Sequence, residues 1–139
     1  MDSIPGLHAH RPAKGSGLTK GAWYSSACHY DPEALDNLPL EKFVAAAHAE
    51  NITINRLSNY ALHTHPVYQE ADIFNQGKPT AIAFGQRDVR QGVGALPVAE
   101  STPQRAFIVP RFVTLDKPFI DRFVDSLAKI VKNRGELLK

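Results

Sequence analysis

The chain has 139 residues, 43% hydrophobic and 22% charged, and a formal net charge of +2 at pH 7. This length fits one domain, and the composition is ordinary for a soluble globular protein. No apolar run approaches the ~18 residues that span a membrane, and the N-terminus lacks the pattern of a secretory signal. Lysine and arginine are scattered, which argues against nucleic-acid binding. The single cysteine, Cys28, excludes an internal disulfide and a cysteine-based zinc site, so a cytoplasmic location is expected.

The first 21 residues contain two prolines and four glycines. This composition favours an extended or mobile entry segment over a helix or strand. His8 and His10 belong to this segment. We therefore predict an entry segment or linker over residues 1–21, followed by one domain over residues 22–139.

The next part of the chain predicts a strand, a helix and a second strand. Residues 23–30 alternate between two faces, as expected of a strand. Pro39 suits a first helical position, and apolar residues follow it at helical spacing, so a helix is predicted over residues 39–50. The β-branched residues at 52–54 predict a short strand.

After the middle of the chain, residues 72–79 predict a turn and residues 80–96 an irregular loop with three glycines. Pro97 follows in a suitable place for the first turn of a helix. The apolar run at 106–110 predicts another strand, which Pro110 ends.

The clearest predicted element is the last helix. Apolar residues between Phe119 and Val131 recur on one helical face. Asp116 is placed to cap its start, Gly135 to end it, and Asp125 to pair with Lys129. Three short strands and three helices, with the longest helix at the C-terminus, predict an α+β two-layer sandwich.

The stretch from 59 to 68 is the strongest candidate for a binding site. Asn59, His63 and His65 offer donors and acceptors, while Tyr60 and Tyr68 offer aromatic walls and hydroxyls. This combination suits a polyhydroxylated small molecule such as a sugar or cyclitol. Two alternatives stay open. The histidines, two apart on a strand, face one way and would bind a metal, or they satisfy backbone groups of a loop.

Seven short motifs follow one another over roughly residues 3–139. They are Trp23-Tyr24-Ser25, Leu62-His63-x-His65-Pro66, Asp72-Ile73, Gly77-Lys78-Pro79-Thr80, Arg87-Asp88-Val89-Arg90-Gln91, Leu96-Pro97-Val98-Ala99-Glu100 and Phe107-Ile108-Val109-Pro110. In this order they resemble the C-terminal small domain of the DegT/DnrJ/StrS family, which are pyridoxal-phosphate-dependent aminotransferases of sugar and cyclitol metabolism with the aspartate-aminotransferase fold.

The resemblance implies a small antiparallel sheet covered by helices, in enzymes that are usually dimers. It also implies that Asn59, His63 and His65 form one wall of the substrate pocket. Arg87 and Arg90 are then expected near the entrance of that pocket. In the family, a large domain carries the lysine that binds pyridoxal phosphate. No lysine of this chain has a matching context, so no cofactor is expected in this chain alone.

We therefore expect a stand-alone aminotransferase-like small domain, non-catalytic by itself, that binds a small polar ligand or self-associates. Such a chain is a family remnant, an excised fragment or half of a split protein. The first alternative is one part of a sugar or cyclitol aminotransferase, completed by a large-domain partner chain in trans. The second is a histidine-based metal-binding protein.

Overall fold

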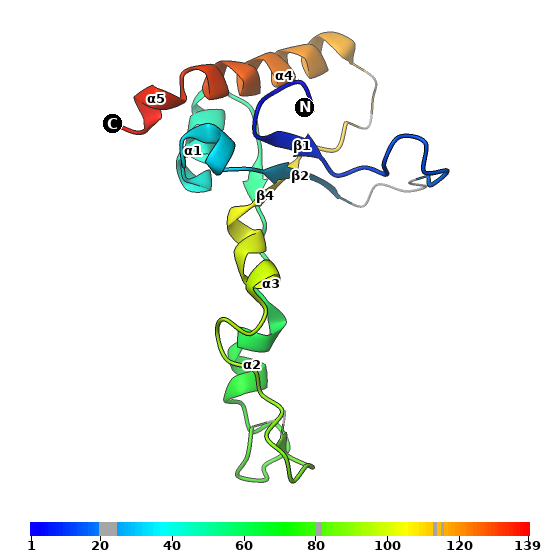
Figure 1. The fold of residues 1–139 in the computed structure, drawn as a ribbon, viewed down its shortest axis with the longest axis vertical. Coiled ribbons are helices and arrows are strands. Elements are labelled where there is room, and N and C mark those ends of the chain that lie inside the picture. Colours follow the sequence, from blue (N-terminus) through cyan, green and yellow to red (C-terminus); the bar gives the residue numbers. More distant parts are fainter. Residues whose placement is uncertain (20–24, 80–81, 113, 115) are drawn as a thin grey trace. The chain divides into compact units, whose positions relative to one another are not determined.

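The computed structural model describes residues 1–19, 25–79, 82–112, 114 and 116–139 (Figure 1). The chain divides into two compact units. The first unit comprises residues 1–57 and 104–139, and the second comprises residues 58–103. None of the helices in the described residues is long and apolar enough to cross a membrane.

The first unit confirms the α+β prediction. Its antiparallel sheet has the order β1-β2-β4-β3, formed by β1 (Leu7–Ala9), β2 (Ser26–Tyr30), β4 (Ala106–Val109) and β3 (Asn55–Arg56). The helical elements of this unit are η1 (Glu33–Leu35), α1 (Leu40–Ala49), α4 (Lys117–Lys132) and α5 (Arg134–Leu137), and they include the long C-terminal helix that the sequence predicts (Figure 1).

Alternation along the strands places one face of the sheet in the core. Leu7 on β1 pairs with Tyr30 on β2, and Cys28 pairs with Phe107 on β4; all four side chains are buried. They pack with apolar residues of α1 and α4 into one cluster. The ring of Phe43 on α1 lies 5.1 Å from that of Tyr30 and 5.7 Å from that of Phe107, centre to centre. The sheet and its helices therefore share one aromatic core.

The entry segment differs from its prediction. It was expected to be an extended or mobile segment without a helix or strand, but β1 lies inside it and pairs with β2. The reason is burial, because Ile4 and Leu7 enter the core. Gly6 makes the turn between them, with φ of 73°, and a Cβ there would lie 2.7 Å from Cγ of Leu35. Only glycine fits such a close approach without displacement.

The strand predicted at 52–54 is also wrong. The amide of Ile52 donates to the carbonyl of Ala47 and closes the end of α1, so it is not available for sheet pairing. Ile52 and Ile54 instead enter the core from the connection, and pairing begins at Asn55. Their β-branched character reflects burial here, and not strand geometry. The strand predicted at 106–110 is confirmed as β4, and β2 begins at Ser26; the Trp23 and Tyr24 positions lie outside the described residues.

Helix α4 is capped as predicted, since the Asp116 side chain accepts a hydrogen bond from the amide of Phe119. Two details differ. Lys129 donates to the carboxylate of Glu50 at 2.8 Å. Its partner is therefore the residue at the C-terminal end of α1 and not Asp125. The helix ends at Lys132, because the side chain of Asn133 donates to the carbonyl of Lys129, and Gly135 lies within α5.

The second unit contains short helical elements and no sheet strand among its described residues. These elements are η2 (Leu62–Thr64), α2 (Pro66–Gln69), α3 (Pro97–Ser101) and the start of η4 (Thr102–Gln104). The predicted turn at 72–79, the irregular loop over the described part of 80–96 and the helix beginning at Pro97 are all observed. Ala83 is the one buried hydrophobic residue in the described part of this unit. The described part of this unit therefore has almost no core of its own.

Candidate functional site

His63 lies in the second unit on the short helix η2 and is held by Glu100 of α3. Its Nε2 atom is 2.8 Å from Oε1 of Glu100. Both side chains are largely shielded, at 10% and 19% exposed. The prediction that His63 and His65 share one face of a strand is wrong, because Pro66 begins α2 directly after a 3-10 turn. The two imidazoles therefore have different hydrogen-bond partners.

Glu100 is the acceptor around which the loop before α3 is arranged. Its carboxylate accepts the amides of Gly94, at 2.8 and 2.9 Å, and of Leu96, at 3.1 Å. These two amides, followed by the contact with His63, lower the pKa of the Glu100 carboxyl. Hydrogen bonds to a carboxylate favour its charged form. An ionised Glu100 thus joins η2, the loop and α3.

Gln69 and Arg90 connect the two sides of the same region. The Gln69 amide group donates to the carbonyls of His63 and Gln91. The Arg90 guanidinium donates to the carbonyl of Gln69 at 3.1 Å and to the carboxylate of Asp88 at 2.7 Å. The guanidinium lowers the pKa of Asp88 to about 2, and Asp88 raises the pKa of Arg90. The charge of Arg90 is therefore balanced locally.

A hollow of about 380 Å³ opens beside these contacts. Its volume falls in the range of small-molecule sites, roughly 300–1,000 Å³. It is lined by Leu62, His63, Tyr68, Gln69, Val89, Arg90 and Gln91. The structure thus brings His63 and Arg90, two of the five predicted site residues, to one hollow with an aromatic side chain and amide groups.

The other three predicted residues do not line this hollow. Asn59 and Arg87 are exposed. Nδ1 of His65 accepts a hydrogen bond from the amide of Val67 and caps α2, while its ring lies 6.4 Å from that of Tyr68. The His65 side chain therefore satisfies a backbone amide, which was one of the alternatives left open by the sequence.

Sequence reasoning did not single out Gln69 or Glu100 as individual site residues. Glu100 stands four positions after Leu96, a spacing at which a side chain can fold back over the start of a short helix. Gln69 closes α2, and nothing in the local pattern indicates that its amide bridges two distant carbonyls. A group of three or more His, Cys, Asp or Glu side chains arranged to hold a metal ion is not found in the described part of the chain.

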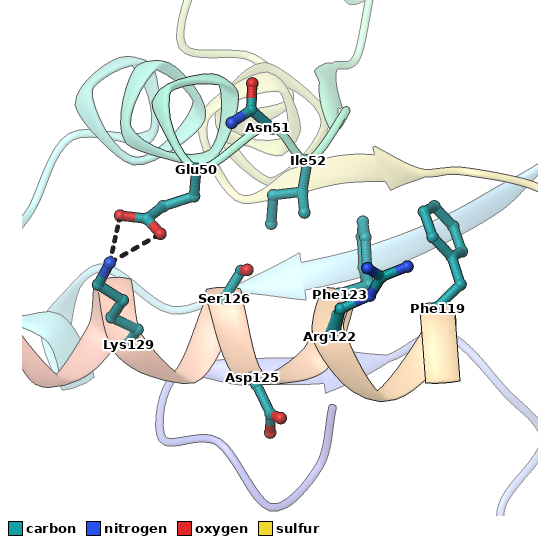
Figure 2. A pocket seen from close by; sticks show the side chains of 9 residues that line it. All are labelled: Glu50, Asn51, Ile52, Phe119, Arg122, Phe123, Asp125, Ser126 and Lys129. Carbon is teal, nitrogen blue, oxygen red and sulfur yellow. Dashed lines mark hydrogen bonds and ion pairs between the residues drawn. The ribbon is translucent and has the colours of Figure 1, made fainter. Parts of the chain in front are cut away.

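A second hollow, of about 440 Å³, lies in the first unit between α4 and the residues that follow α1 (Figure 2). Figure 2 shows the Glu50–Lys129 ion pair at one end and Phe119 and Phe123 at the other. Arg122 and Asp125 add one charge of each sign. These charges and aromatic rings select no particular ligand, so we assign none.

Comparison of the chain with models of known protein families gives no match, and comparison with curated protein sequences gives none either.

Proposed function

We propose that this chain is a non-catalytic small domain of the aminotransferase type that binds a small, neutral, hydroxyl-rich ligand at the hollow beside His63 and Arg90. The proposal rests mainly on that hollow, because two residues predicted from the sequence line it together. The ordered motifs of the DegT/DnrJ/StrS small domain and the α+β fold with its antiparallel sheet support the family assignment that the proposal includes.

The chemistry of the lining favours a sugar or cyclitol over an anion. Arg90 is already paired with Asp88, so the hollow presents little uncompensated positive charge. The exposed ring of Tyr68 and the side chains of Leu62 and Val89 offer apolar surface to the C–H face of a ring. The side chain of Gln69 and the backbone of Gln91 are polar groups at the same wall. Apolar walls with a few placed polar groups are typical of small-molecule sites.

The proposal assigns no catalytic residue and no cofactor to this chain. Hydrogen bonds within the protein already engage Nε2 of His63 and the guanidinium of Arg90. We therefore assign both side chains to the wall of the hollow. A cytoplasmic location is part of the proposal, because Cys28 is the only cysteine and is buried.

Ligand binding is tested by titrating the chain with myo-inositol while recording two-dimensional amide NMR spectra. The proposal expects saturable shifts at the Gln69 and Gln91 amides, and about tenfold weaker binding in Tyr68→Ala. Tyr60→Ala is the matched control, because Tyr60 is 77% exposed in the same unit and does not line the hollow. Equal binding by both variants, or no shifts up to the solubility limit of the ligand, would refute the site.

A second candidate function is favoured by the apolar surface of the second unit. Its described residues expose large hydrophobic side chains at Tyr60, Leu62, Val67, Tyr68, Ile73, Phe74, Phe84, Val89, Val93, Leu96 and Val98. A segment with so few buried side chains gains little stability from its own packing. Its apolar surface is suited to contact with another protein surface. We therefore retain, as the alternative, one part of a pyridoxal-phosphate-dependent aminotransferase completed in trans by a large-domain chain.

Sedimentation velocity separates the possible partners. The alternative expects a monomer alone and a stoichiometric complex when a large-domain chain of the family is added. A concentration-dependent dimer of this chain alone indicates self-association instead. A monomer that gives no complex with large-domain chains would remove the alternative and leave the ligand-binding proposal in place.

A further inference from the structure

Three of the six histidines of the chain gather on the outer face of the sheet, a grouping that no sequence motif indicates. His8 on β1 is the direct register partner of His29 on β2. The amide of His10 donates to the carbonyl of Ala27, so pairing continues one residue past β1. Because residues two apart in a strand share a face, His8, His10 and His29 lie on the same side.

This face is the one turned away from the core. The neighbours Leu7, Cys28 and Tyr30 are buried, whereas His8, His10 and His29 are all exposed. The alternation of side chains along the strands thus places the Cys28 thiol and the three imidazoles on opposite faces of the sheet. Any ligand that meets the outer face meets imidazoles and not sulfur.

The rings of His10 and His29 already stand at a separation that suits chelation. Their centres are 5.4 Å apart and their planes are inclined at 80°. In a tetrahedral site with metal–nitrogen bonds of about 2.0–2.1 Å, the centres of two bound imidazoles lie roughly 5 Å apart. The observed separation of the two ring centres is therefore close to that of two imidazoles bound to one ion.

We propose that His10 and His29 bind one divalent transition-metal ion of the Zn²⁺, Ni²⁺ or Cu²⁺ class on this face. Imidazole suits these ions, whereas Mg²⁺ and Ca²⁺ prefer oxygen ligands. The site has two fixed ligands, since the described residues contain no ready-made group of three. Water fills the open positions, and His8 lies on the same face of the sheet as the two ligands. The Asp2 carboxylate lies nearby but is already paired, because it accepts from the Ala9 amide and from Arg11.

The inference is independent of the proposed sugar or cyclitol site. It uses residues of the first unit alone, and it differs from the metal site considered for His63 and His65. An ion that binds the folded chain in preference to the unfolded chain also raises the apparent free energy of unfolding. Binding and stability therefore give two separate readouts.

The test is calorimetric titration of protein purified without a histidine tag, using ZnCl₂ and CuCl₂ in a buffer that does not coordinate metals. We expect one ion per chain and about tenfold weaker binding in His10→Gln and His29→Gln. His8→Gln is expected to weaken binding less than either. His65→Gln is the control, because His65 belongs to the second unit, and it is expected to bind like the parent chain.

Two further measurements keep the test decisive. The ion is expected to raise the unfolding temperature of the parent and of His65→Gln but not of His10→Gln. Cu²⁺ is expected to broaden the NMR signals of Ala27 and Ile108, which pair on the same sheet face. Unchanged affinity in both His10→Gln and His29→Gln, absence of binding by the parent, or broadening centred on His63 and His65 would overturn the proposal.

Discussion

Nε2 of His63 lies 2.8 Å from Oε1 of Glu100, although 37 positions separate the two residues in the chain. The same carboxylate accepts the amides of Gly94 and Leu96. In a unit whose described residues contain one buried hydrophobic side chain, this polar junction takes over part of the organising role that a core usually has.

Replacing Glu100 by Gln is expected to loosen this junction. An amide oxygen is a weaker acceptor than a carboxylate, and its NH₂ group faces donors where the second oxygen stood. We expect faster hydrogen exchange at Gly94 and Leu96 and faster proteolysis within 92–97. Glu70→Gln, at an exposed position of the same unit, is the control and is expected to leave both rates unchanged. Identical exchange in the two variants would argue against the role of Glu100.

Acid is expected to have the same effect on the parent chain. The pKa of Glu100 is lower in the folded chain than the ordinary value of about 4.3. Its carboxylate therefore contributes stability fully above that value, and the contribution is lost as the pH falls through the lowered pKa. Hydrogen exchange at Gly94 and Leu96, corrected for its intrinsic pH dependence, is expected to accelerate below about pH 4. In Glu100→Gln this acid-dependent step should be absent.

The aromatic core predicts the largest stability effect. Phe107 is fully buried between the rings of Tyr30 and Phe43. Phe107→Ala is expected to lower the free energy of unfolding by about 3–5 kcal/mol, because it removes buried surface and leaves a cavity. Urea unfolding followed by circular dichroism measures the change. Phe84→Ala, at a side chain that is 77% exposed, is the matched control and should change the transition little. Similar effects of the two substitutions would contradict the assigned core.

The cap of α4 predicts a smaller, local effect. The side chain of Asp116 accepts the Phe119 amide at 3.1 Å. Asp116→Ala is expected to lower the free energy of unfolding by about 1 kcal/mol through loss of this cap. Asp125→Ala removes a carboxylate from the middle of the same helix and is expected to have a smaller effect, since Lys129 is paired with Glu50. Urea midpoints of the two variants provide the comparison.

The local sequence pattern was sufficient to predict elements whose structure depends mainly on their own residues. The helical spacing after Pro39 and the stripe from Phe119 to Val131 both predict helices that the structure contains. The α+β class follows from such elements. Pattern failed where distant contacts decide the outcome. Leu7 becomes part of a strand only because β2 lies beside it, and Ile54 is a core residue of a connection instead of a strand residue.

In the candidate site, too, the local pattern predicted some features, and contacts between distant residues determined others. The composition of 59–68 indicated a recognition region, and His63 and Arg90 do line one hollow. The contacts of Glu100 with His63 and of Gln69 with Gln91 were not predictable, because they join residues 37 and 22 positions apart in the chain. Likewise, His8-x-His10 and His29 are unremarkable until strand pairing aligns them. The alternation of Leu7, His8, Ala9 and His10 was the available signal for a strand.

The most direct test of the proposed function is the myo-inositol titration of the parent chain, Tyr68→Ala and Tyr60→Ala. We expect saturable amide shifts at Gln69 and Gln91 in the parent and in Tyr60→Ala, and about tenfold weaker binding in Tyr68→Ala. Shifts that are absent from the parent, or that persist with equal affinity in Tyr68→Ala, would contradict it.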